Sequence, residues 1–142
     1  MTVWRGSAEI RTKRRLEVID VTRQVRSLVA QSGVREGIVN VWLGHTTAGV
    51  TVNEADPDLW EDLLETLSRL VPLDAHYRHN AKYAGFSREQ NAHAHIISMV
   101  MQPEVTIPVS KGDLMLGTWQ SVLLVELDGP RTRRVVVTVV GD

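Results

Sequence analysis

The sequence predicts an α+β fold built from antiparallel strands and two main helices. Two segments carry apolar residues at helical spacing behind a recognisable start signal. Short stretches rich in β-branched residues, separated by turn signals, occupy the beginning of the chain and its last third. These strands do not alternate regularly with helices, as they would in a parallel βαβ fold. A length of 142 residues favours one domain over residues 1–142.

The first predicted helix follows two short strands, Val3–Ile10 and Leu16–Val18. Asp20, Val21 and Thr22 offer caps for its start, and Gly33 is the expected stop. Its apolar face is predicted to contain Val21, Val25, Leu28 and Val29.

The second predicted helix follows a pair of antiparallel strands, Ile38–Leu43 and Gly49–Asn53, joined by a connection that carries His45. Asp56 is a suitable N-cap and Pro57 a suitable first helical residue. The helix should end at Pro72, and its predicted buried stripe is Leu59, Leu63, Leu67 and Leu70.

Residues 72–90 lack clean periodicity, which in a compact domain is typical of a functional or mobile loop. Asn91 is expected to cap a short helix that ends near Met101. On a helix, residues two apart point in different directions, so we expect His95 on the inward face and His93 off it. The remaining predicted strands are Glu104–Val109, Leu114–Leu116, Thr118–Leu127 and Arg133–Val140.

The composition limits which partners the protein is expected to bind and in which cellular compartment it is expected to work. The net charge of −1 gives no electrostatic signal for nucleic acid or membrane, and the basic runs Arg11–Arg15 and Arg131–Arg134 are expected to be solvated strand ends. The absence of cysteine excludes a disulfide framework, an iron–sulfur cluster and a thiol nucleophile, and it fits the cytoplasm. Met1–Gly6 has no apolar leader and no stretch is long enough to span a bilayer, so we expect a soluble cytoplasmic protein.

All five histidines lie between His45 and His95, and imidazole is the commonest metal ligand as well as an acid–base group near neutrality. His45 stands at a strand end, where it is a turn residue or a ligand. Glu54 stands at the next strand end, where it is a ligand, a partner of a ligand or a base. Taken alone, His95 is more typical of a core or surface histidine.

Gly117–Gln120 begins an apolar strand and favours a bulge with a packed Trp119. Gln120 then needs hydrogen-bond partners, and Glu126 and Arg134 are polar residues that could pair across strands. The phosphate-binding, dinucleotide, zinc-protease and serine-hydrolase motifs are missing from the sequence, which disfavours ATP-driven, redox and serine-hydrolase chemistry.

These residues together resemble the YjbQ-like family. The resemblance covers nearly the whole chain. It rests on single residues (Asp62, Pro72 and Glu126) and on these segments: His45–Ala48, Asn53–Pro57, Tyr77–His79, Asn91–Ile96, Ile107–Val109, Leu116–Gln120 and Gly141–Asp142. It implies a two-sheet antiparallel β-sandwich that assembles as a homotrimer. It also implies a divalent metal, expected to be zinc, bound by His45, His79 and His95, with Glu54, Trp119 and Gln120 nearby.

The function implied by the resemblance is secondary thiamine-phosphate synthesis, in which a thiazole phosphate joins a pyrimidine pyrophosphate and pyrophosphate leaves. The expected catalytic residues are His45, Glu54 and Gln120, and the expected substrate-binding residues are Thr46, Asn53, Trp119 and Gln120. Two alternatives stay open. One is a metal-dependent hydrolase or lyase acting on a small phosphorylated metabolite, because three histidines would leave zinc an open position. The other is a trimer that binds a ligand or metal without catalysis.

Two further expectations concern the departures from the family and the assembly. Some relatives carry acidic residues where Asn80–Gln90 has almost none, and Asn91 or His93 could take over their role. The apolar strands Ser121–Leu127 and Val135–Val140 hold more hydrophobic surface than a small domain usually hides, so part of it is predicted to be buried between subunits.

Overall fold

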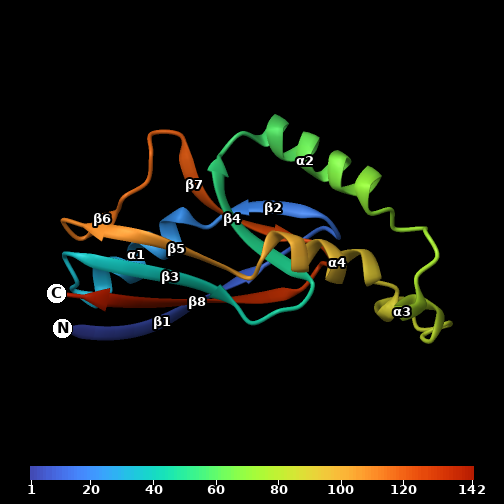
Figure 1. Ribbon diagram of the computed structural model, residues 1–142, viewed down its shortest axis with the longest axis horizontal. Coiled ribbons are helices and arrows are strands. Elements are labelled where there is room, and N and C mark those ends of the chain that lie inside the picture. The colour runs from blue at the N-terminus through green and yellow to red at the C-terminus, as the bar shows by residue number, and fades with distance from the viewer.

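The computed structural model describes residues 1–142, apart from the side chain of Arg88 (Figure 1). Its elements, in chain order, are β1 (Thr2–Arg11), β2 (Glu17–Asp20), α1 (Thr22–Ser32), β3 (Gly37–Leu43), β4 (Ala48–Glu54), α2 (Pro57–Leu70), α3 (Arg78–Ala81), the 3-10 turn Ser87–Glu89, α4 (Ala92–Met101), β5 (Glu104–Ser110), β6 (Asp113–Leu114), β7 (Gln120–Glu126) and β8 (Thr132–Gly141).

The strands form two antiparallel sheets, as predicted. The larger has five strands in the order β1-β8-β3-β5-β6, and the smaller has three in the order β2-β7-β4. One face of each sheet, together with helix α1, encloses the main core, which contains Val39 and Val137 from the larger sheet and Val50 and Leu124 from the smaller.

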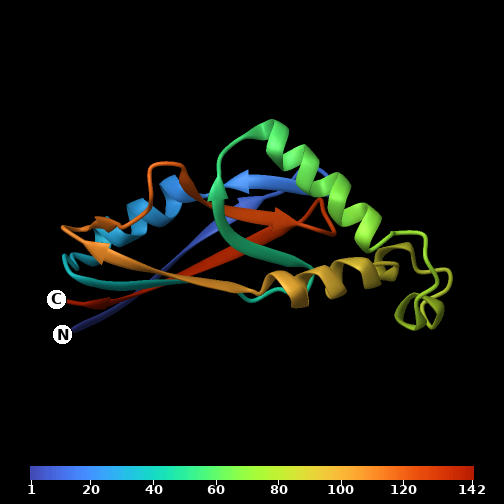
Figure 2. The same ribbon diagram turned by 45° about the horizontal axis from the view of Figure 1, so that its top comes forward.

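Helices α2 and α4 cover the other face of the small sheet. Leu64 of α2 and Ala94 and Ile97 of α4 pack there against Leu123 and Val125 of β7. Figure 2 shows these helices converging toward the segment that carries α3 and separating toward the opposite end. The chain ends lie side by side, and the Met1 amino group is 3.1 Å from an Asp142 carboxylate oxygen.

The position of β7 explains one of the two apolar strands for which subunit contacts were predicted, whereas for β8 the contacts stay a prediction. Val122 and Leu124 face the main core, whereas Leu123, Val125 and Leu127 face α2 and α4. All five are buried within a single chain because β7 is the central strand of a sheet covered on both faces. The continuous apolar run of β7 is therefore explained without a second subunit.

The predicted helix boundaries are confirmed at two positions. The Asp56 side chain accepts a hydrogen bond from the Asp58 backbone N–H at 3.0 Å, and Pro57 opens α2. Gly33 ends α1 with a φ of 73°, a left-handed conformation that glycine adopts without steric cost.

The predicted faces of α2 and α4 are wrong in part. Leu59 and Leu70 are 40% and 72% exposed, and Leu64 is the buried leucine of α2. In α4 the buried histidine is His93, at 1% exposed, whereas His95 is half-buried. Helix α4 is apolar on nearly all sides, so periodicity could not identify the face that meets the sheet.

The two predicted main helices, α1 with eleven residues and α2 with fourteen, and the predicted short helix that ends at Met101, α4 with ten, are all present, and α3 is an additional short helix. The segment 72–90 is partly ordered by α3. The Asn80 side chain accepts a hydrogen bond from the Ala92 backbone N–H at 2.9 Å and so caps α4 in place of Asn91.

Among the described residues, none of the helices has the length and apolar character required to cross a membrane.

Candidate histidine-bearing site

A buried ion pair organises one end of the molecule. Glu126, at the end of β7, is fully buried, and its carboxylate accepts a hydrogen bond from the Arg133 Nε at 2.9 Å and another from an Arg133 terminal nitrogen. Thr12 donates to it at 2.7 Å. Arg133 also donates to the Thr47 carbonyl and hydroxyl, so the pair ties the β7–β8 turn to the β3–β4 connection. The expected partner of Glu126, Arg134, is exposed.

The β7–β8 turn carries Asp128, which lies at the centre of a second polar network. Its carboxylate accepts hydrogen bonds from Arg131 and from the Asn91 side-chain nitrogen, each at 2.8 Å, and Arg15 lies 3.9 Å away. Because a carboxylate only accepts, Asn91 must present its side-chain oxygen to His79, whose Nε2 lies 3.0 Å from it. His79 therefore donates from Nε2, and its Nδ1 carries the lone pair when the ring is neutral.

His79 and His95 form the one pair of predicted ligands in contact. Their ring centroids are 4.8 Å apart, with the edge of one ring toward the face of the other. Burial lowers the pKa of His95, and the neighbouring His79 lowers it further, against opposing effects of Asp128 and Glu89. At neutral pH His95 is thus an uncharged imidazole beside a second imidazole, which suits proton transfer or hydrogen bonding to a substrate.

His45 is held separately, on the connection between β3 and β4. Its Nε2 accepts a hydrogen bond from the Arg134 backbone N–H at 2.9 Å, so the neutral ring carries its proton on Nδ1. Burial lowers the pKa of His45, and the nearby Arg133 lowers it further. Thr46, a predicted substrate contact, is exposed beside it.

His93 was predicted from helical spacing to lie off the inward face of its helix, but it is the buried histidine of α4. Its Nε2 donates to the Leu127 carbonyl at 3.1 Å, and its buried Nδ1 has no hydrogen-bond partner among the described residues. Burial lowers the pKa of His93, so the ring stays neutral and serves to join α4 to the end of β7.

The three-histidine metal centre is not assembled within the described residues of one chain. No group of three histidine or acidic side chains there is placed to hold a metal ion. His79 and His95 offer two ligands, whereas protein zinc sites use three or four. In the neutral form of His45, Nε2 accepts from the Arg134 backbone N–H and Nδ1 carries the proton, so neither nitrogen presents a free lone pair to a metal. The donor set therefore does not fit zinc in a single chain, and zinc bound by these residues stays a prediction.

The remaining predicted residues lie at the other end of β4. Ala48, close to His45, pairs with Glu126, whereas Glu54 pairs with Gln120. Because a strand rises about 3.3 Å per residue, these two ends are about 20 Å apart. Asn53, Glu54, Trp119 and Gln120 line a hollow of about 270 Å³ there. The sequence predicted that these residues form one site. Within a single chain they lie at two separate places, one at each end of β4.

Gln120 has a structural role that accounts for its position on an apolar strand. Its side-chain oxygen accepts a hydrogen bond from the Gly117 backbone N–H at 2.8 Å, and its own backbone N–H donates to the Gly117 carbonyl. This closes the turn that holds Trp119 outward, so Trp119 is 74% exposed, contrary to the expectation that it packs.

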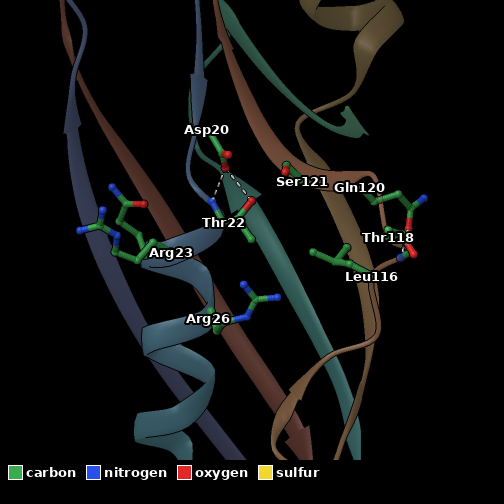
Figure 3. Close-up of a pocket in the computed structure, with 10 residues that line it drawn as sticks. Asp20, Thr22, Arg23, Arg26, Leu116, Thr118, Gln120 and Ser121 are labelled. Atoms are coloured by element: carbon green, nitrogen blue, oxygen red, sulfur yellow. Dashed lines mark hydrogen bonds between the residues drawn. The ribbon is translucent and has the colours of Figure 1, made fainter. Parts of the chain in front are cut away.

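The same turn borders a hollow of about 730 Å³ between α1 and the segment before β7. Figure 3 shows Arg26 pointing from α1 into this cleft, with Leu116, Thr118 and Gln120 along the opposite wall. The Arg26 guanidinium is already paired with Asp113 at 2.7 Å.

Sequence reasoning missed the residues that connect the histidines: Asp128, Arg131 and Arg133. The arginines were expected to be solvated strand ends, and Asp128 belongs to the turn between β7 and β8. The alternation of β8 was the available signal, because it places Arg133 on the same face as Val135 and Val137, and hence inside.

Comparison with known proteins places this arrangement in a family. A family model described as UPF0047 protein YjbQ-like matches residues 6–142. The chain belongs to this family. Its resemblance to YjbQ-like sequences is thereby confirmed over nearly its full length. A UPF0047 protein from Methanothermobacter thermautotrophicus is 40% identical over 141 residues, covering 99% of this chain and 94% of that protein. UPF0047 protein YugU from Bacillus subtilis is 36% identical over 138 residues, covering 94% and 96% respectively.

Solved structures of similar proteins agree with the fold. A YbjQ-like protein of unknown function from Sulfolobus solfataricus P2 superposes with a TM-score of 0.93 at 34% identity, covering 99% of both chains. A hypothetical protein from Aeropyrum pernix K1 superposes with a TM-score of 0.91 at 40% identity, covering 98% of this chain and 99% of that one. These relatives share the two-sheet α+β fold, and their names give no activity.

Proposed function

We propose that the histidine-bearing end is an active site for a small phosphorylated metabolite. We further propose that the reaction is secondary thiamine-phosphate synthesis. The observation that carries the proposal is the contact between His79 and His95 at the end of the hydrogen-bonded chain from Arg131 through Asp128 and Asn91. Asn91 and Asp128 connect these two imidazoles to a hollow that Asp128 lines together with Arg15 and Arg131.

The hollow supplies a place for phosphate groups. It measures about 290 Å³ and is lined by Arg15, Ser87, Asp128, Gly129, Pro130 and Arg131. Arg131 donates to both the Asp128 carbonyl and its carboxylate, so its guanidinium is held in a fixed direction. A guanidinium that is positioned in advance stabilises negative charge that develops on a leaving pyrophosphate.

The histidines would act on the transferred group. In the proposed reaction the thiazole nitrogen forms a bond to the methylene carbon of the pyrimidine while the bond from that carbon to pyrophosphate breaks. His95 would donate a hydrogen bond to a departing oxygen, because an uncharged imidazole can donate without repelling the bound arginines, and the Nδ1 lone pair of His79 would accept a hydrogen bond or a proton from the substrate. No step requires Glu54 or Gln120, which lie at the opposite end of β4.

The proposal is tested by incubating the purified protein with the thiazole phosphate and the pyrimidine pyrophosphate and measuring thiamine phosphate by mass spectrometry. His95→Ala should lower the rate by about 100-fold or more. His76→Ala is the matched control, because His76 is exposed and outside both networks. Product formed equally by all three proteins, or by none, would reject this reaction.

A metal-dependent hydrolase or lyase is the second candidate, favoured by the contact of His79 with His95, which offers two ligands close together. It requires a metal on His45, His79 and His95, with His45 turned away from Arg134. Elemental analysis of freshly purified protein should then find stoichiometric zinc that is lost in His79→Ala and kept in His76→Ala. Active protein without metal would exclude this candidate.

We also propose that the protein assembles as a homotrimer. Support comes from the outer face of α4, where Ile96, Met99 and Val100 are 39%, 72% and 79% exposed. A helix that is apolar all round is usually covered, and exposed apolar patches commonly mark contact sites. Light scattering should give three times the 15.9 kDa chain mass, and Met99→Lys should shift the protein toward monomer. A monodisperse wild-type monomer would reject the trimer.

A further inference from the structure

The end of β4 opposite the histidines carries a site with a different chemistry. Two adjacent hollows, of about 270 Å³ and 240 Å³, share Asn53, Glu54 and Leu59 as lining residues. Trp119 lines the first, and Trp60, Leu63, Met101 and Leu123 line the second. The second hollow is lined by residues from the beginning of α2 and the end of α4, which are the ends at which these two helices separate (Figure 2).

Glu54 is the charged residue that lines both hollows. Its carboxylate forms no hydrogen bond or ion pair with the other described residues. Its hydrogen bonds outside the strand ladder use the backbone: the N–H donates to Asn53, and the carbonyl accepts from the Trp60 indole at 3.1 Å and from the Asp56 N–H. The side chain is half-buried. The lining residues of the two hollows include no lysine, arginine or histidine. An unpaired carboxylate in such surroundings favours a positively charged partner.

The two indoles restrict the shape of that partner. Trp60 is held by its hydrogen bond to the Glu54 carbonyl, and Trp119 is held outward by the Gly117–Gln120 turn. Indole faces attract cations most strongly among the aromatic side chains, and they also stack on planar rings. The volume of each hollow suits one ring and is below the range of drug-sized pockets, which starts at about 300 Å³.

We propose that this second site binds a small planar organic cation, such as a protonated amidine or amino-substituted heteroaromatic ring. Its charge would pair with Glu54, and its ring would lie against Trp119 and the apolar floor formed by Leu59, Leu63 and Met101. This inference is independent of the reaction proposed for the histidine-bearing end, because it uses none of its residues.

Benzamidinium and benzamide form a matched pair of probes, since they have nearly the same shape and differ in charge. Each is titrated into the full-length protein while the four indole N–H signals are followed by NMR. Benzamidinium should shift the Trp60 and Trp119 signals saturably and leave Trp4 and Trp42 unchanged. Benzamide should bind at least about fivefold more weakly.

Variants assign the binding to individual side chains. Glu54→Gln keeps the shape and removes the charge, so it should weaken benzamidinium binding by about tenfold and abolish the preference over benzamide. Trp119→Leu should weaken it by about threefold. Glu65→Gln removes the same charge from an exposed position on α2 and should change nothing. Equal affinity for the two probes, indifference to Glu54→Gln, or no binding by benzamidinium would overturn the proposal.

Discussion

The two ends of β4 differ in how their polar groups are satisfied. At the Ala48 end, Glu126 and Arg133 are almost completely buried, and the carboxylate accepts hydrogen bonds from Arg133, Thr12 and the following backbone. At the Glu54 end, a half-buried carboxylate has no side-chain partner among the described residues, and the surrounding groups are mainly apolar. A network in which every polar group has a hydrogen-bond partner holds its residues in place. A carboxylate without a partner can still form hydrogen bonds or an ion pair with a ligand.

The largest effect should come from breaking the saturated network. Arg133→Met leaves Glu126 charged and buried, so the free energy of unfolding should fall by about 3–5 kcal/mol in urea denaturation. The double variant Glu126→Leu with Arg133→Met should recover much of that loss. Asp113→Asn, which breaks the exposed pair with Arg26, should cost less than about 1 kcal/mol. Equal losses for the buried and the exposed pair would contradict this contrast.

A smaller loss is expected at the link between the network and the histidines. Asn91→Ala deprives both Asp128 and His79 of a buried hydrogen-bond partner. Unfolding free energy should fall by about 1–3 kcal/mol, and thiamine-phosphate formation should fall with it. Asn53→Ala at the opposite end should leave both measurements nearly unchanged, because Asn53 is exposed. A stable and fully active Asn91→Ala protein would separate the histidines from the network.

The pH dependence of stability should also originate at the histidine-bearing end. The pKa values of His45, His93 and His95 are lowered, in each case chiefly by burial. The unfolded chain therefore binds more protons than the folded one once the pH falls below about 6.5, the ordinary pKa of histidine. Stability should be fully present above that pH and should decrease toward acid.

Denaturation at several pH values between 7.5 and 5.5 measures this effect. His93→Gln can still donate to the Leu127 carbonyl but cannot be protonated. Its loss of stability on acidification should be smaller than that of the wild type, by at most about 1.4 kcal/mol per pH unit. Parallel curves for the two proteins would show that His93 does not contribute.

The smallest effect on stability is expected at the most exposed aromatic residue of the Glu54 end. Trp119→Ala should change the free energy of unfolding by less than about 0.5 kcal/mol, because the side chain is 74% exposed. Trp60→Ala should cost clearly more, since Trp60 packs against the second core and donates to Glu54. Calorimetry of both variants distinguishes a ligand-facing tryptophan from a packed one. A large loss of unfolding free energy in Trp119→Ala would indicate that Trp119 has a packing role.

Local signals in the sequence were sufficient for most element boundaries. Asp56 with Pro57 predicted the start of α2, and Gly33 predicted the end of α1, because caps depend on nearby backbone groups. The same reasoning failed for α4, where apolar residues surround the helix and His95 was taken for the inward histidine in place of His93. Asn91 begins that helix, yet its side chain bonds Asp128 and His79 while Asn80 caps the first turn.

By itself, the sequence determined the antiparallel α+β class, the family and which residue types are available for chemistry. These depend on periodicity, turn residues and ordered motifs, all of which can be read along the chain. Only the tertiary structure decided which of those residues meet. His79 and His95 come into contact through the packing of α3 against α4, and the ladder between β4 and β7 separates His45 from Glu54. Such distances depend on strand register and helix packing, which contacts between distant parts of the chain establish together.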